Sequence, residues 1–346
     1  MRNKIFNLLV VIVLACIFLY LFIFSNGLTK LLTQFKTLSL IWLIIAGFCI
    51  IMFWLFETLI LYIITKSLYC TDHLFIKSLK AAMIGQFFSA ITPFQSGGQP
   101  SQLYVMTEND IPAGFSGSIL MVKFIIHQAT LTLYSILVIV LEFNFFNSKI
   151  PYFIYFCFLG FTLNTIIIIF ALIFSINDKL TGKILIVMLK VVRKIKFIKN
   201  FENKYEHIEE ELKSFHESAA FISKNAKLCI FSSILTLFQW TVYYSIPFCI
   251  YKSFGLNSAN LWTMVSAQVF LTMFMSFIPL PGAAVGAEGG FFLIFGIFFN
   301  GESIVPAIFM WRIITYYASI AAGGLASVLL PNINSQNIKI STKYPL

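Results

Sequence analysis

The sequence predicts an all-α polytopic membrane protein with about six full transmembrane helices and two opposed broken helical elements. Of its 346 residues, 59% are hydrophobic and only 11% are charged, which leaves too little polar surface for a soluble globule. Several apolar runs reach the roughly 20 residues that a helix needs to cross about 30 Å of hydrocarbon. Two of the apolar segments are interrupted by polar sequence rich in glycine and proline, which predicts the broken elements.

The full spans are expected in apolar runs that polar or basic segments separate. They are 5–24, 38–64, 116–141, 152–174, 228–251 and 304–330. The first run follows Arg2 and Lys4 and resembles a signal peptide, but it is long and has no small-residue cleavage site. We therefore expect it to be retained as a span.

The first broken element is expected at 78–106, around the sequence TPFQSGGQPSQ, and the second at 261–300, around IPLPGAAVGAEGG. Non-helical backbone is tolerated at membrane depth only where it is buried in protein or lines a wet cavity. Each element is expected to be a re-entrant hairpin, and their corresponding positions predict an inverted repeat. Hydropathy alone leaves open the alternative of eight plain spans with kinks.

Charge predicts the domain organisation and the topology. The expected parts are an N-terminal membrane half (1–175), a linker (176–227), a C-terminal membrane half (228–332) and a short tail (333–346). The linker carries eleven Lys or Arg and seven Asp or Glu, and the positive-inside rule therefore places it, with both termini, in the cytoplasm. We expect its acidic run from Glu206 to Glu217 to be a solvated helix.

The net charge of +10 comes mostly from basic segments that flank spans. Membrane topology explains such a pattern better than nucleic-acid binding does, and no nucleic-acid partner is expected. The basic stretch 183–199 either anchors the topology or lies against anionic lipid of the inner leaflet. The six cysteines are scattered without a CxxC pair or a histidine at metal-ligand spacing, so we interpret them as packing residues and expect no metal or other cofactor.

Charged residues inside a bilayer are costly and by default mark functional pathways. The candidates are Glu57, Lys123, His127, Glu288 and Arg312. We expect the pairs Glu57–Lys123 and Glu288–Arg312, with a possible charge relay through Glu57, Lys123 and His127. The alternative is structural, because long side chains near a span end snorkel to the interface, and a lone histidine is commonly a hydrogen-bonded core residue.

The first break offers a set of neutral polar groups for substrate binding. They are the side chains of Thr92, Gln95, Ser96, Gln99, Gln102 and Tyr104, together with the backbone at Gly97 and Gly98. Free backbone N–H groups at a helix end can cradle a phosphate or a polyol. The alternative is a kink whose amides satisfy one another. No Ser-x-x-Lys, HExxH, Walker or GxSxG arrangement is present, so no catalytic residue is expected.

Together the segments PFQSGGQPSQLYVM and PLPGAAVGAEGGFF resemble the signature segments of MprF-type lysylphosphatidylglycerol synthase/flippase proteins, in their transmembrane domain. The resemblance covers nearly the whole chain. It implies a bacterial cell-membrane domain that moves lysylphosphatidylglycerol or another anionic lipid between leaflets and contributes to resistance against cationic peptides.

The sequence departs from this family in two respects. We expect no soluble synthase domain, and we therefore expect lysine transfer to phosphatidylglycerol only with a separate synthase protein. Gln99 and Gln102 also stand where many relatives carry an acid and an arginine. The leading hypothesis is a lipid flippase-like transporter; the alternatives are a lipid-metabolism enzyme or its membrane subunit, and a membrane scaffold.

Overall fold

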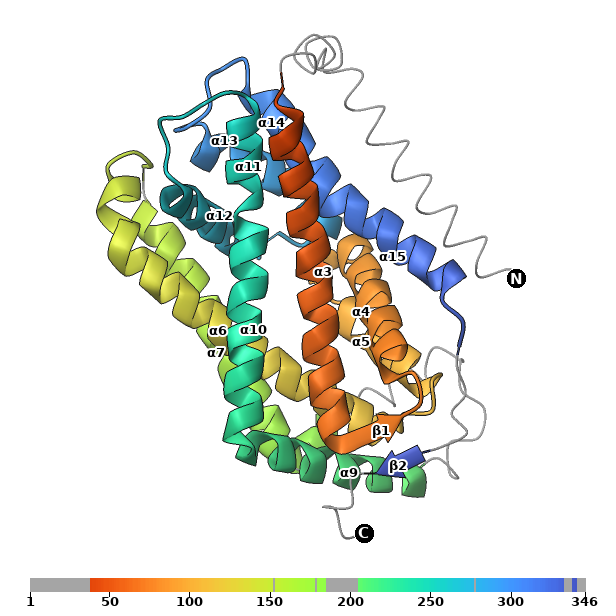
Figure 1. The fold of residues 1–346 in the computed structure, drawn as a ribbon. Helices are drawn as coiled ribbons and strands as arrows, with labels where there is room; N and C mark the ends of the chain where they lie inside the picture. Colours follow the sequence, from red (N-terminus) through yellow and green to blue (C-terminus); the bar gives the residue numbers. More distant parts are fainter. Residues whose placement is uncertain are drawn as a thin grey trace.

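A computed structural model describes residues 38–151, 153–177, 179–184, 205–276, 278–332 and 338–340. The chain forms a bundle of long, apolar helices (Figure 1). Six helices in these ranges are long and apolar enough to cross a membrane. The predicted class, an all-α polytopic membrane protein, is confirmed, and five of the six expected full spans are found. The expected span 5–24 lies outside the described residues.

The five spans are continuous or nearly continuous helices. They are α3 (Leu40–Leu68), α6 (Ala113–Asn147), α7 (Phe153–Ile176), α10 (Ala226–Tyr244) with α11 (Ile246–Ser253), and α14 (Ile304–Arg312) with α15 (Ala318–Leu329). Five residues of π-helix, Ile313–Tyr317, join α14 to α15. The sixth candidate span is α4 (Leu74–Ile91), the first arm of the first broken element.

Each broken element consists of a helix, a short 3-10 turn and a second helix of ten residues. In the first, α4 is followed by the turn Pro93–Gln95 and by α5 (Gly98–Thr107). In the second, α12 (Leu261–Met275) is followed by the turn Pro281–Ala283 and by α13 (Gly286–Phe295). The breaks therefore fall where proline and glycine predict them.

The two breaks follow the same backbone path. Thr92 (φ −113°, ψ 148°) and Leu280 (φ −117°, ψ 149°) are extended, because a following proline disfavours the α region. Two residues later the backbone is in the left-handed region in both turns, at Phe94 (φ 53°) and at Gly282 (φ 59°). The turns begin at residues 93 and 281, and the helices that follow begin at residues 98 and 286. Both pairs of starting residues are 188 residues apart.

The two halves run in opposite directions. In Figure 1, α3 descends to the short strand β1 (Tyr69–Thr71), whereas α10 rises from the lower end of the bundle to α11. The hairpin of α4 and α5 enters from the lower end, and that of α12 and α13 from the upper end (Figure 1). The two proline-containing turns meet inside the bundle. An inverted repeat accounts for both the matching backbone and the opposite direction.

The structure corrects the expectation of a solvated acidic helix. Helix α9 (Tyr205–Lys224) lies across the lower end of the bundle and packs against α6 (Figure 1). Its apolar face buries Phe215, Ala219 and Ile222, while the Glu211 carboxylate accepts a hydrogen bond from the backbone N–H of Gly114. A carboxylate at that position complements the positive end of α6. The helix is amphipathic, and only its outer face is exposed.

A two-stranded antiparallel ribbon was not predicted. Strand β1 pairs with β2 (Ile338–Ile340), with Tyr69 opposite Ile340 and Thr71 opposite Ile338. The ribbon joins the end of α3 to the chain after the last span at the lower end of the bundle (Figure 1).

Candidate functional site

The two predicted ion pairs are present, and each belongs to one of two separate charged clusters. The first, here called the inner cluster, consists of Glu57, Gln102, Lys123 and Gln239. The second, the tip pair, consists of Glu288 and Arg312. Lys123 and Arg312 each lie on the first helix after a broken element, 189 residues apart. The two cations therefore occupy nearly equivalent places in the repeat, but their acidic partners do not.

The inner cluster joins four helices through one carboxylate. Glu57 on α3 pairs with the Lys123 ammonium on α6 and accepts a hydrogen bond of 3.0 Å from Gln239 Nε2 on α10. Gln102 on α5 lies between the ions, with Nε2 3.4 Å from Glu57 Oε1 and Oε1 3.3 Å from Lys123 Nζ. All four side chains are buried. Both oxygens of Glu57 thus have partners from the protein itself.

His127 lies beside this cluster, one helical turn after Lys123 on α6. Its ring packs edge-on against Trp240 with the ring centroids 5.1 Å apart. The three residues expected to form a charge relay are therefore close together, and Trp240 follows directly after Gln239 on α10. Relay activity itself stays a prediction.

The tip pair lies where the second broken element meets α14. Arg312 Nε donates to Glu288 Oε1 at 2.7 Å, and Arg312 Nη1 donates to the carbonyl oxygen of Gly282 at 2.9 Å. The Arg312 side chain is 4% exposed and that of Glu288 is 35% exposed. Glu288 Oε2 has no hydrogen-bond partner. Gln239 Oε1 of the inner cluster also has no hydrogen-bond partner, but only in the tip pair is a carboxylate oxygen unsatisfied and the acidic side chain partly exposed.

The aromatic rings that contact Arg312 and the π-helix that follows it were not predicted from the sequence. The guanidinium lies over the rings of Trp311 and Tyr316, 5.1 and 5.2 Å from their centroids. The π-helix begins directly after Arg312, and such segments are frequent at functional sites. Tyr316 belongs to this π-helix. No hydropathy pattern signals a π-helix, which is why sequence reasoning missed it.

Tyr316 joins the tips of the two broken elements. Its hydroxyl donates to the carbonyl oxygen of Ala90 at the end of α4, at 3.3 Å. A Cβ added to Gly282 would lie 2.2 Å from the Tyr316 ring, so only glycine allows the second turn to approach this closely. The left-handed φ of Gly282 also favours glycine.

The predicted binding residues of the first break lie in different environments. Thr92 is structural, because its hydroxyl donates to the Phe88 carbonyl oxygen and accepts from the Gly97 N–H. Gly98 is buried against α4, where an added Cβ would lie 2.0 Å from Ser89 Oγ. Gln95, Ser96 and Gln99 are exposed at the tip.

Gln102 and Tyr104 turn away from that exposed tip. Gln102 points into the inner cluster, whereas Tyr104 is exposed on the outside of α5. Of the side chains expected to bind substrate at the first break, the structure therefore brings only Gln95, Ser96 and Gln99 together at the exposed tip.

Comparison with known proteins identifies the type of membrane domain. A family model described as the lysylphosphatidylglycerol synthase TM region matches residues 6–323. A UPF0104 membrane protein of Archaeoglobus fulgidus is 25% identical over 311 residues, which cover 86% of this chain and 88% of that protein.

Proposed function

The chain belongs to the family of the lysylphosphatidylglycerol synthase transmembrane region, and we propose that it is a lipid flippase-like transporter. Its substrate is lysylphosphatidylglycerol or another anionic, phosphate-bearing lipid, which it moves between the leaflets of the cell membrane. In this proposal any lysine transfer is carried out by a separate synthase protein.

The proposal rests mainly on one observation, the meeting of two broken helices beside a partly open ion pair. Helices α5 and α13 both begin at the breaks, so both direct their N-termini toward the same region inside the bundle. The first N–H groups of a helix have no partner within it and carry partial positive charge. Two such ends and the Arg312 guanidinium provide donors for a phosphate.

The tip pair also suits a headgroup that carries both charges. Arg312 uses Nε and Nη1 for Glu288 and Gly282, and a guanidinium has five N–H donors in all. The remaining donors serve a phosphate, while Glu288 Oε2, which is buried without a hydrogen-bond partner, is left for an ammonium or a hydroxyl group of the headgroup. The exposed amides and hydroxyl of Gln95, Ser96 and Gln99 line the opposite tip.

Transport then follows from the inverted repeat. The headgroup lies between the two tips, the acyl chains stay in the bilayer, and rocking of one half against the other opens the tips to each leaflet in turn. With the linker and both termini in the cytoplasm, the hairpin of α4 and α5 enters from the inner side and that of α12 and α13 from the outer side.

Leaflet exchange in reconstituted vesicles tests the proposal. Fluorescent phosphatidylglycerol, lysylphosphatidylglycerol and phosphatidylcholine are added in separate vesicles, and exchange is followed by loss of fluorescence after a membrane-impermeant quencher is added. We expect faster exchange than in protein-free vesicles for at least one anionic or lysyl lipid, and a smaller effect for phosphatidylcholine. Exchange equal to that of protein-free vesicles across the whole panel would contradict the proposal.

A further inference from the structure

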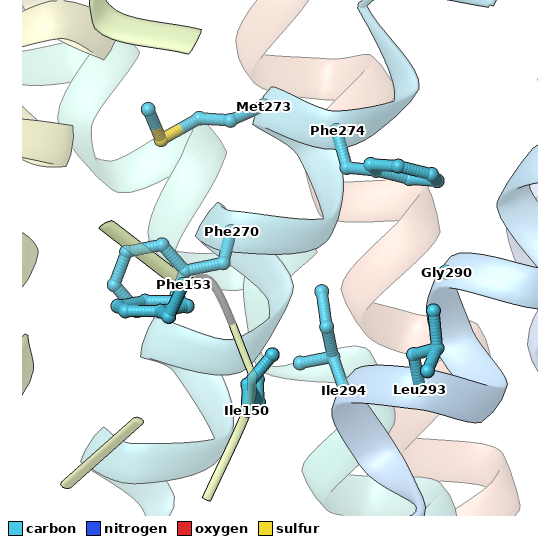
Figure 2. Close-up of a pocket in the computed structure, with 8 residues that line it drawn as sticks. All are labelled: Ile150, Phe153, Phe270, Met273, Phe274, Gly290, Leu293 and Ile294. Carbon is cyan, nitrogen blue, oxygen red and sulfur yellow. The ribbon is translucent and has the colours of Figure 1, made fainter. Parts of the chain in front are cut away.

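An apolar groove lies between α12, α13 and the turn that joins α6 to α7. Figure 2 labels its eight lining residues, of which seven have apolar side chains and one is Gly290. About 480 Å³ of space in the groove is not occupied by protein atoms, and part of this space is open at the surface of the bundle. None of the described residues that line it has a charged or hydrogen-bonding side chain, so its chemistry differs from that of the tip pair.

The groove extends from the surface of the bundle into its core. At the rim, Leu293 is 62% exposed, whereas Met273 is 5% and Ile294 8% exposed. The inner wall contains the rings of Phe153 and Phe270, packed edge to face with centroids 4.6 Å apart. Protein interiors are normally filled to crystal-like density, because unfilled apolar space loses dispersion contacts. Space of this kind stabilises a ligand that fills it.

We propose that the groove binds one acyl chain of a membrane phospholipid. Water has no polar partner there, and apolar cavities of this kind stay dry. The rim belongs to α13, whose exposed Phe292 and Leu293 face hydrocarbon in a membrane-spanning bundle. A helix from a second copy is about 10–12 Å wide with its side chains, whereas a single unbranched chain can enter between side chains.

The bound lipid is distinct from the transported one. Glu288 and Gly290 are two residues apart on α13, which separates them by roughly 200° around the helix. The groove therefore lies across α13 from the tip pair, and this inference goes beyond the proposed function.

At Gly290 the two arms of the second hairpin are in close contact. An added Cβ at this residue would lie 2.7 Å from Leu271 Cδ1 on α12. A chain in the groove touches both arms near this point and supports the position of α13 by packing.

Photolabelling of the full chain in lipid nanodiscs tests this site. The probe is a phosphatidylcholine with a diazirine in the middle of one acyl chain, and labelled residues are mapped by mass spectrometry. We expect stronger labelling at Met273 and Ile294 than at Phe48 on α3, although Phe48 is 59% exposed and the other two are nearly buried. Labelling that follows exposed area, with Phe48 the strongest of the three, would overturn the proposal.

Variants that fill the groove sharpen the test. Met273→Trp and Ile294→Trp should each lower labelling of the groove about tenfold, which corresponds to about 1.4 kcal/mol of binding. Leu329→Trp, at an exposed position on α15, is the matched control and should leave it unchanged. Met273→Phe, with a smaller side chain, replaces any tryptophan variant that fails to elute as folded protein.

The outcomes separate this site from the proposed function. Unchanged labelling in folded, filled variants, or cross-linking of the groove to a second copy of the chain, would overturn the acyl-chain site. Groove labelling in a protein that exchanges no lipid would support the site while contradicting transport.

Discussion

The two halves of the molecule build the same broken helix but surround it with different chemistry. In the first half, Glu57, Lys123 and Gln102 are buried, and both carboxylate oxygens have protein partners. In the second half, Glu288 is partly exposed and one of its oxygens has none. The backbone match shows that proline and glycine determine the break itself, while the side chains around each hairpin determine whether its ion pair is buried or partly exposed.

This difference assigns different roles to the two ion pairs. A buried charge with satisfied partners stabilises the arrangement of the helices that provide those partners. A charged group with a free oxygen next to two helix ends has capacity for a ligand. We therefore infer that the inner cluster holds the first hairpin against α3, α6 and α10, and that the tip pair contacts the substrate.

The largest expected effect is on stability, from the loss of the Glu57 charge. Glu57→Gln leaves the buried Lys123 ammonium without a counter-charge, and we expect the free energy of unfolding to fall by about 3 kcal/mol. Thermal or denaturant unfolding in detergent measures the change. Glu108→Gln, at an exposed position on the end of α5, is the control. The double variant Glu57→Gln/Lys123→Met removes both charges and should recover most of the loss. An unchanged unfolding transition in Glu57→Gln would contradict a stabilising role for the inner cluster.

The next effect is on transport, from the loss of the Glu288 charge. Glu288→Gln keeps an oxygen for Arg312 but loses the charged acceptor, and a charged hydrogen bond contributes about 1.5–3 kcal/mol. We expect lipid exchange to fall by about tenfold to a hundredfold. The loss of stability should be smaller than in Glu57→Gln, because Glu288 is partly exposed and the nearly buried Arg312 keeps its hydrogen bond to the Gly282 carbonyl oxygen. Exchange assays normalised to folded protein measure this. A stability loss as large as that of Glu57→Gln would reverse the assignment.

A smaller effect is expected at the left-handed glycine of the second tip. Gly282→Ala places a methyl group at φ 59°, in contact with the Tyr316 ring, and should reduce stability by about 1–3 kcal/mol. Exchange should fall as well, because Tyr316 joins the two tips. Gly301→Ala, at a position where an added Cβ has open space, is the control. Wild-type unfolding in Gly282→Ala would argue against this close approach.

The smallest expected effect is a gain in stability, and it is expected at the residue of the first tip that is equivalent to Gly282. Phe94 has a left-handed φ of 53° and an exposed side chain. Phe94→Gly relieves the steric cost of that conformation but adds flexibility to the unfolded chain, so we expect a gain of at most about 1 kcal/mol. Unfolding measurements compare it with Gly282→Ala. A clear loss of stability would mean that the Phe94 ring packs in the native state.

Sequence reasoning predicted the features that depend on rare residues. Prolines and glycines in apolar sequence located both breaks, and the scarcity of intramembrane charge limited the partners of Glu57 and Glu288 to Lys123 and Arg312. What it missed depends on tertiary packing. Gln99 and Gln102 have the same chemistry, yet one is exposed and the other is buried, because the first turn of α5 projects at the tip and the next turn packs against α4 and α6. The π-helix and the docking of α9 likewise have no local signal.

The most direct test of the account is lipid exchange in two variants measured side by side, Glu57→Gln/Lys123→Met and Glu288→Gln, each corrected for the amount of folded protein. If the inner cluster is structural and the tip pair contacts the headgroup, the first should exchange lipid within about twofold of the wild type. The second should lose about tenfold or more. Exchange abolished in the folded double variant but retained in Glu288→Gln would contradict the account and favour a charge relay through the inner cluster.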